Sequence, residues 1–167
     1  CSTCSTEYPT PTPFYELDLQ LAPTLKEAIE NYLSEEELVG VNKYHCRRCN
    51  EKQNAKRFIR LDSLPDTLNF QLLRFVFHRE SGQKKKLTSF IQFPEELDMS
   101  EYLKSPPGSH LYSLVAVLSH KGPSAHSGHY IVNICNSSGD WYQFSDDKVE
   151  KMQNKRIEDD DDNGKQK

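Results

Sequence analysis

Residues 127–147 read SGHYIVNICNSSGDWYQFSDD, and this stretch has the pattern of a β-hairpin. The segments HYIVNIC (129–135) and WYQF (141–144) are rich in aromatic and β-branched residues, which favour strands. The five residues NSSGD (136–140) between them are asparagine, serine, glycine and aspartate, the types that form tight connections. We therefore expect two antiparallel strands joined by a five-residue loop.

This hairpin brings a histidine near polar side chains. His129 opens the first strand, and antiparallel pairing places it opposite the end of the second, where Ser145 or Asp146 can reach its ring. An imidazole beside a hydrogen-bond acceptor supplies two members of a Cys/His/Asx or Ser/His/Asp catalytic group. A histidine beside an acidic residue is also a common surface contact, so the spacing alone leaves both interpretations open.

The rest of the second half of the chain is rich in short strand patterns as well. Apolar segments alternate with turns that contain proline or glycine. The strands expected from this pattern are KRFIRL (56–61), LNFQLLRFVF (68–77), LTSFIQFP (87–94) and YSLVAVLSH (112–120), with turns around SLPD (63–66), ESGQ (80–83) and SPPGS (105–109).

The first half of the chain predicts one strand and one helix. In FYELDLQL (14–21) apolar residues alternate with polar ones, which is typical of a strand with one buried face. Thr24 stands three residues before Glu27, the spacing of a helix capping box, and apolar residues recur after it at helical spacing. The pattern predicts a helix that runs to about Val39 and stops at Gly40.

Four of the five cysteines form two C-x-x-C pairs, Cys1 with Cys4 and Cys46 with Cys49. Two residues between thiolates let one turn present both sulfurs to a tetrahedral cation, and two such turns complete the four-sulfur shell of a structural zinc. The alternatives are a disulfide framework, which suits an exported chain, and unrelated buried thiols. The remaining Cys135 has the pattern of a small core thiol.

The composition excludes several classes of protein. The 167 residues are 35% hydrophobic and 28% charged, a lean supply for one domain with its own core. A formal charge of -4 disfavours a partner that is nucleic acid or an anionic membrane surface, and no apolar run has the roughly 18 residues that span a bilayer. The N-terminus lacks the features of a signal peptide and begins with cysteine, so we expect missing upstream sequence and a reducing compartment, the cytosol or the nucleus.

Several stretches together resemble the ubiquitin-specific proteases, papain-like cysteine peptidases that remove ubiquitin from lysine side chains. Residues 127–147 resemble the histidine box of that family, LPDTLNFQLLRFVF (64–77) its central strand motif and FPEELDMSEYL (93–103) the segment after it, while the two C-x-x-C pairs resemble its zinc-bearing fingers. The resemblance covers residues 1 to about 149. It implies an α+β fold with a β-rich palm and zinc-ribbon fingers, in which the N-terminal thumb half is missing.

The resemblance also implies roles for individual residues. His129 would be the general base and then the general acid of a thiol peptidase. Tyr130, Phe75 and Gly128 would contact the extended C-terminal tail of ubiquitin. The loops RESGQKKKL (79–87) and KGPSAHSG (121–128) resemble the two loops that border the channel for this tail.

The sequence departs from the family pattern at two points. The family's nucleophile lies in a box of the type G-N-T-C-Y, and this string does not occur in the chain. Cys135 cannot replace it, because six residues of strand separate it from His129 by about 20 Å. Where the family usually has Asn or Asp after the aromatic residue, this chain has Ser145, and we expect Asp146 to contribute more to kcat than Ser145 does.

Two functional hypotheses follow, with a third that the compartment argument makes remote. The first is the C-terminal half of a deubiquitinating catalytic domain (1–150) with a charged, disordered tail (151–167), which is inactive without the nucleophile. Its partners would be ubiquitin, ubiquitinated proteins and the missing N-terminal half. The second is a non-catalytic, zinc-stabilised module that binds ubiquitin or another protein, and the third is a secreted disulfide domain.

Overall fold

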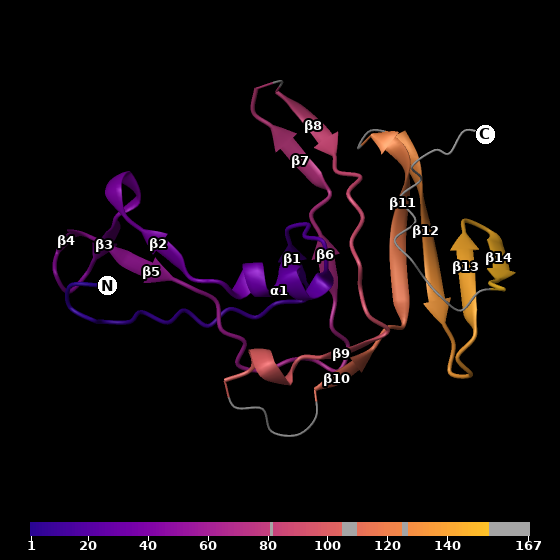
Figure 1. Ribbon diagram of the computed structural model, residues 1–167, viewed down its shortest axis with the longest axis horizontal. Coiled ribbons are helices and arrows are strands. Elements are labelled where there is room, and N and C mark those ends of the chain that lie inside the picture. Colours follow the sequence, from indigo (N-terminus) through magenta and orange to yellow (C-terminus); the bar gives the residue numbers. More distant parts are fainter. Residues whose placement is uncertain (81, 105–109, 125–126, 154–167) are drawn as a thin grey trace.

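The structure is a computed structural model that describes residues 1–80, 82–104, 110–124 and 127–153. Within these ranges the chain forms one α-helix, two short 3-10 helices and fourteen short strands, so strands dominate an α+β arrangement. The molecule is elongated, with a small lobe at one end, the helix in the middle and a four-stranded sheet at the other end (Figure 1). No helix in these ranges combines the length and the apolar character that crossing a bilayer requires.

The helix α1 (Leu25–Leu33) begins where the sequence predicts. The Thr24 hydroxyl accepts a hydrogen bond of 3.1 Å from the backbone N–H of Glu27, so the predicted N-cap is confirmed. Ala28 and Ile29 form the buried face of the helix. A cap of this kind satisfies one of the N–H groups that the first helical turn leaves without a partner.

The helix ends at Leu33, so the predicted extension to Val39 is wrong. After Leu33 the chain turns extended and forms β2 (Glu36–Leu38), which pairs antiparallel with β5 (Ala55–Arg57). The pairing sets carboxylates against cations: Lys56 Nζ lies 2.8 Å from Glu35, and Arg57 pairs with Glu36. The strand pair places a cation beside two of the three successive glutamates.

The core lies between α1 and a short parallel strand pair. β1 (Leu17–Leu19) confirms the predicted strand at 14–21, and it pairs in parallel with β6 (Phe70–Leu72). The buried residues of this cluster are Leu17, Leu19, Ala28, Ile29, Leu61, Ile91, Met99 and Leu103. The cluster is small, in keeping with the lean apolar content of the sequence.

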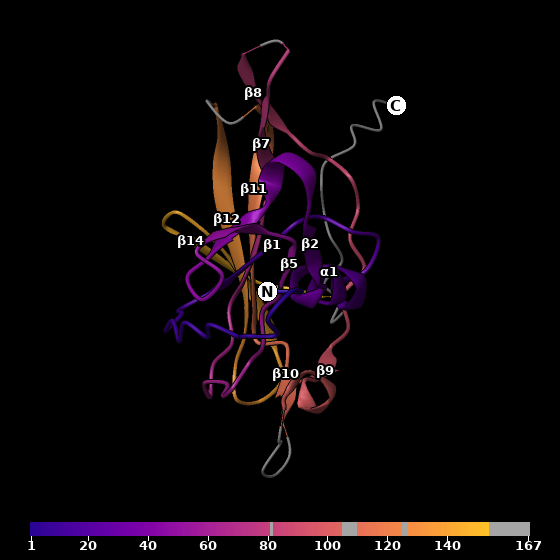
Figure 2. The same cartoon turned by 90° about the vertical axis from the view of Figure 1, so that its left-hand side faces the viewer.

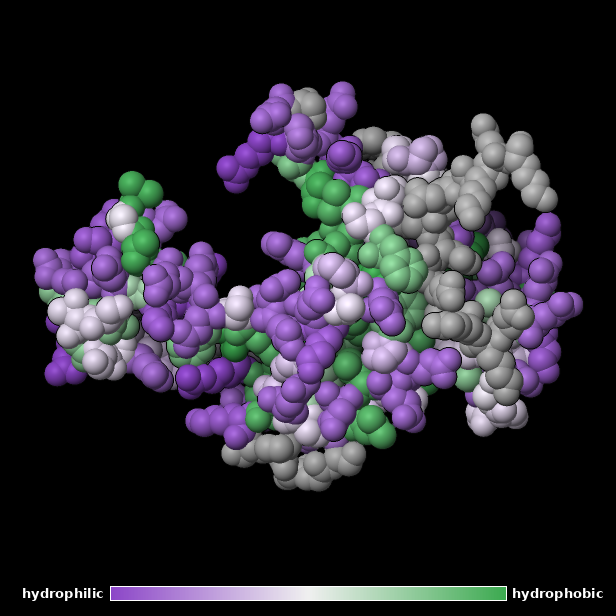
Figure 3. Space-filling view, viewed as in Figure 1, coloured by the Kyte–Doolittle hydropathy of each residue, from purple (hydrophilic) through white to green (hydrophobic). Residues whose placement is uncertain are grey.

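The small lobe contains the β2–β5 pair and a hairpin of β3 (Tyr44–Cys46) and β4 (Glu51–Gln53). The N-terminal segment is tied to it, because the N–H of Ser2 donates to the carbonyl of Asn54 at 2.9 Å. The face of the lobe seen in Figure 3 is mostly hydrophilic, with one apolar tip, and the short 3-10 helix η1 (Gly40–Asn42) leaves Val41 92% exposed.

The predicted strand at 68–77 is broken into β6 and β7 (Phe75–His78), and β7 pairs antiparallel with β8 (Gln83–Lys86). The segment predicted as a strand at 87–94 forms only one isolated bridge, from Gln92 to Thr24. The Arg74 guanidinium donates to the carbonyls of Leu87 and Ser89, and these contacts take the place of a strand ladder.

The predicted strand at 112–120 is likewise divided. β10 (Leu111–Ser113) pairs antiparallel with β9 (Glu96–Asp98), and η2 (Ser100–Tyr102) follows β9. β11 (Ala116–Ser124) then joins a different sheet. Turned by 90°, the structure shows the β7–β8 hairpin at one end and the β9–β10 pair at the opposite end (Figure 2).

The four-stranded antiparallel sheet has the order β11, β12 (Ser127–Cys135), β13 (Trp141–Ser145) and β14 (Lys148–Lys151). The predicted hairpin is confirmed, since Cys135 pairs with Trp141 across the five-residue loop. The sequence did not predict β14. The predicted disordered tail (151–167) is wrong at its start, because Lys151 belongs to β14; the predicted turn at 105–109 and residues 154–167 lie outside the described residues.

Candidate active site and metal centre

His129 lies near the start of β12, and its ring contacts the end of β13. Its Nε2 lies 2.8 Å from the Ser145 hydroxyl, a hydrogen-bond distance, and its Nδ1 lies 3.9 Å from an Asp146 carboxylate oxygen. The structure therefore brings together the three residues that the sequence analysis places near one another.

A tight turn holds the two acceptors against the ring. Ser145 pairs with Lys148 across only two residues, and Asp146 has a φ of 54°, the left-handed conformation that aspartate tolerates in turns. The strand β14 closes this turn. The unpredicted β14 therefore fixes the position of Ser145 and Asp146 relative to His129.

The distances show that Ser145 interacts more strongly with the His129 ring than Asp146 does. In the tautomer with its proton on Nε2, His129 donates to the Ser145 oxygen, and Nδ1 has a lone pair that can accept a proton. The Asp146 side chain is 79% exposed, so water screens its attraction to a protonated ring. The geometry favours Ser145 as the group that orients the imidazole, with Asp146 as a weaker electrostatic partner.

Three rings lie in contact on the opposite face of the sheet from His129. The Phe75 ring meets His120 edge-on with centroids 5.4 Å apart, and His120 meets Tyr130 at 4.8 Å. Tyr130 is 58% exposed and Phe75 is 38% exposed, so both present apolar surface to solvent. His120 was not singled out from the sequence, since no residue pattern marks a histidine that packs between two aromatic rings.

Gly128 lies beneath the His120 ring. A Cβ atom at Gly128 would overlap the His120 imidazole and lie 2.6 Å from the carbonyl oxygen of Lys121. Any larger residue would have to displace the ring or the backbone. This position therefore requires glycine for a packing reason, directly before His129.

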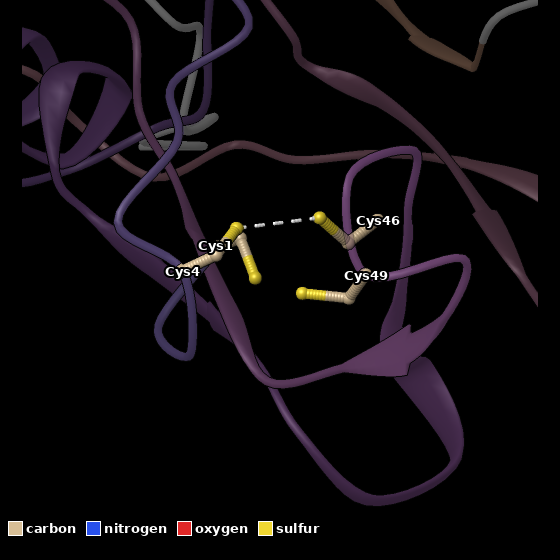
Figure 4. Close-up of side chains that lie close together, drawn as sticks. All are labelled: Cys1, Cys4, Cys46 and Cys49. Atoms are coloured by element: carbon tan, nitrogen blue, oxygen red, sulfur yellow. Dashed lines mark hydrogen bonds between the residues drawn. The ribbon is translucent and has the colours of Figure 1, made fainter.

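Cys1, Cys4, Cys46 and Cys49 gather in the small lobe, where two chain segments meet (Figure 4). All four sulfur atoms lie within 4.8 Å of one another, and those of Cys4 and Cys46 are 3.6 Å apart. A zinc–sulfur bond of about 2.3 Å puts neighbouring sulfurs of a regular tetrahedron about 3.8 Å apart. The donor set and its dimensions therefore fit one divalent metal ion.

Both C-x-x-C segments adopt the same turn. The residue after each second cysteine, Ser5 in one turn and Asn50 in the other, has a positive φ of 55° and 57°. The N–H of Ser5 donates to the carbonyl of Cys1 at 3.0 Å, and the N–H of Asn50 donates to that of Cys46 at 2.8 Å. The two matched turns aim their sulfurs at a common point.

The surroundings of the cysteines favour thiolate at one of them. Contacts with Thr6 lower the pKa of Cys4 to about 6, whereas burial and neighbouring thiols raise the pKa of Cys49 to about 11. Arg48 links the two segments, because its guanidinium donates to the Thr6 hydroxyl and its backbone N–H donates to the Tyr8 oxygen. The lobe is thus tied together by polar contacts outside the sulfur shell.

Cys135 takes no part in either site. It pairs with Trp141 at the far end of β12 from His129, and its thiol contacts the carbonyl of Asn136. The sequence-based conclusion that Cys135 is not the partner of His129 agrees with this placement.

Comparison with known proteins places the chain in a family. The model of the family described as ubiquitin carboxyl-terminal hydrolase matches residues 10–165. Ubiquitin carboxyl-terminal hydrolase 48 of Danio rerio is 50% identical over 161 residues, which cover 95% of this chain and 15% of that protein. The Rattus norvegicus protein of the same name is also 50% identical over 161 residues, 95% of this chain and 16% of its own length.

The stretches 14–21, 52–61 and 74–87 indicate a likeness to ubiquitin carboxyl-terminal hydrolase 48 within the family, and the comparison confirms it. The chain spans about 15% of the length of these curated relatives.

Solved structures agree with this assignment. A chain of the SAGA DUB module that contains Ubp8 and is bound to monoubiquitin aligns with a TM-score of 0.78 and 33% identity, over 91% of this chain and 34% of that one. A chain of the yeast SAGA DUB module aligns with a TM-score of 0.79 and 33% identity, over 90% and 34%. The family match, the relatives and the shared fold together show that this chain belongs to the ubiquitin carboxyl-terminal hydrolase family.

Proposed function

We propose that this chain is the histidine-bearing part of a deubiquitinating cysteine peptidase, which hydrolyses isopeptide bonds at the C-terminal glycine of ubiquitin. The observation that carries the proposal is the hydrogen-bond contact between His129 and Ser145, on adjacent strands of a chain from the hydrolase family. Such a contact orients an imidazole and leaves its second nitrogen available for proton transfer.

In the proposed mechanism His129 moves protons and a cysteine elsewhere in the complete protein forms the bonds. Nδ1 of His129 takes the proton of the thiol, and the thiolate attacks the glycine carbonyl carbon. Collapse of the tetrahedral adduct breaks the bond to the lysine nitrogen, which receives the proton from His129. Water then hydrolyses the thioester, with His129 as its base.

The nucleophile is proposed to lie in an N-terminal half of the catalytic domain that packs against this chain. Exposed apolar side chains of the β11–β14 sheet support a segment that packs against this chain; by the strand pairing they share the face of Tyr130, and His129 points to the other face. The exposed side chains are Leu118 at 67%, Tyr130 at 58%, Val149 at 54% and Ile134 at 39%. An exposed apolar face of this kind marks an interaction surface.

Tyr130, Phe75 and Gly128 are proposed to contact the extended C-terminal tail of ubiquitin. Two of them belong to the contact of three rings beside His129, and Gly128 offers no side chain that would block an approaching backbone. The relatives' names and the monoubiquitin-bound module support ubiquitin as the substrate. Ubiquitinated proteins are then the second class of partner, with no role for nucleic acid or membrane.

A structural zinc ion is proposed at Cys1, Cys4, Cys46 and Cys49. Zinc at this site links the N-terminal segment to the β3–β4 hairpin and supplies folding energy rather than catalysis. This would make the small lobe a zinc ribbon, the fingers of the family fold. Reduced thiols of this kind suit the cytosol or the nucleus.

The division of labour is tested with the isolated chain and the complete protein that contains it. Both are assayed with ubiquitin joined at its C-terminus to a fluorogenic amine. The account predicts turnover by the complete protein and none by residues 1–167, which lack the nucleophile. Turnover by the isolated chain would overturn the proposal, and ubiquitin binding without turnover by the complete protein would favour a non-catalytic binding module instead.

A further inference from the structure

We propose that Lys86 is a positioning residue for the reaction, which holds the backbone before His129 without touching the substrate. The inference rests on the proposed function for its catalytic consequence. The buried ammonium group of Lys86 in β8 joins the β7–β8 hairpin to the β11–β12 hairpin.

Lys86 is an unusual lysine for its surroundings. Among the described residues only Lys86, at 9% exposed, and Asn133, at 6%, are buried polar or charged residues. An ammonium group is costly to bury unless acceptors take its donors. Lys86 Nζ donates to the carbonyl of His120 at 2.9 Å and to the carbonyl of Gly122 at 3.1 Å.

These two carbonyls lie on either side of Lys121, next to an interruption in the β11–β12 ladder. Lys121 pairs with His129, but the next pair is Ser124 with Ser127, so the register shifts between them. An irregularity of this kind leaves backbone groups without ladder partners and re-aims the strand. The Lys86 ammonium group donates to the carbonyls on both sides of Lys121, the residue that pairs with His129.

The backbone of Gly122 in β11 packs closely against the backbone of β12. A Cβ atom on Gly122 would lie 2.6 Å from the Cα of Gly128 and 2.7 Å from the carbonyl oxygen of Ser127. The backbone that Lys86 holds is therefore in contact with the residues directly before His129.

Lys86 is also the cross-strand partner of Phe75 in the β7–β8 hairpin. One side chain therefore connects the hairpin that presents Phe75 to β11, the strand that pairs with the part of β12 that presents His129 and Tyr130. Lys86 therefore ties the hairpin of Phe75 to the strand next to Tyr130 and Gly128. This arrangement pre-organises His129, and orientation of this kind sets the rate of the chemical step.

The test uses the complete protein with three variants. Lys86→Met removes the donor and keeps an unbranched stem, Lys86→Arg keeps a cationic donor, and Lys104→Met makes the same chemical change at an exposed lysine. We expect Lys86→Met to lower kcat by roughly 10- to 100-fold with a smaller change in KM. Lys86→Arg should recover part of the rate, and Lys104→Met should match the unmodified protein.

A second readout is independent of catalysis. Amide hydrogen exchange of peptides that cover 116–135 should be faster in Lys86→Met than in the unmodified protein, with the melting temperature recorded for each variant. The same peptides should exchange at the original rate in Lys104→Met.

The outcomes separate this inference from the proposed function. Unchanged exchange in Lys86→Met, or a kcat equal to that of the unmodified protein, would overturn the positioning role. A melting temperature that falls in Lys86→Met and Lys86→Arg alike, with no recovery of kcat by arginine, would assign Lys86 a merely structural role. If the unmodified protein has no turnover, the proposed function fails, and the exchange measurement alone decides whether Lys86 holds this backbone.

Discussion

The imidazole of His129 has two acceptors of unequal strength beside it. Ser145 is at hydrogen-bond distance from Nε2, whereas Asp146 lies 3.9 Å from Nδ1 and is mostly in water. A neutral hydrogen bond contributes about 1 kcal/mol, and an exposed ion pair contributes roughly 0.2–1 kcal/mol. The sequence alone ranks Asp146 first because of its charge, while the distances favour Ser145.

We therefore expect Ser145→Ala to lower kcat more than Asp146→Ala does. The loss for Ser145→Ala should be about 5- to 10-fold, since about 1 kcal/mol of orientation is removed. Single-turnover kinetics of the complete protein measure this step directly. Asp147→Ala, which changes the neighbouring carboxylate, serves as the control and should change the rate little. A larger loss in Asp146→Ala would restore the ranking made from sequence.

The proximity of these residues could be predicted because it depends on one local hairpin. The five-residue loop at 136–140 sets the register of β12 and β13, and the register brings the end of β13 to His129. Lys86 and His120 could not be found in this way. Their contacts depend on how separate hairpins pack together, and a run of three lysines contains no signal that its last member is buried.

At the scale of elements, caps and turns were more predictable than strand boundaries. The Thr24 cap is local, so its spacing to Glu27 located the start of α1. The chain after α1 instead pairs as β2 with β5, a contact between segments that lie apart in the sequence. The segment at 87–94 is not a strand, and Arg74, which lies outside it, binds two of its carbonyls.

The cap of α1 gives a test of element stability. Thr24→Ala removes the acceptor for the Glu27 N–H and should lower the free energy of unfolding by about 1 kcal/mol. Thr24→Ser keeps a hydroxyl and should retain most of the stability. Denaturant titration of both variants measures the difference, and equal stabilities would show that the cap contributes nothing.

The small lobe gives a test of the metal centre. Metal analysis should find about one zinc per chain, because four cysteines form one tetrahedral set. Cys46→Ser should lose the zinc and raise hydrogen exchange in β3 and β4, while the β12–β13 hairpin keeps its protection.

Cys135→Ser is the matched control for this test, since Cys135 lies outside the cluster and its replacement should leave the zinc content unchanged. An unaltered small lobe without bound metal would remove the zinc proposal.

At the scale of the molecule, the chain has one small core and a large share of exposed apolar residues. The core contains eight buried residues around α1, while the β11–β14 sheet exposes a row of large apolar side chains. The chain also covers only about a third of the chains it matches in solved structures. Both facts support the proposal that this chain packs against another part of the complete protein.

The central claim is that His129 carries the protons of a deubiquitination reaction. The most direct measurement is turnover of ubiquitin with a C-terminal fluorogenic amine by the complete protein, with and without His129→Ala. The account predicts that His129→Ala lowers kcat by at least about 100-fold, while ubiquitin affinity and melting temperature change little. Turnover by His129→Ala at a rate close to that of the unmodified protein would contradict the account.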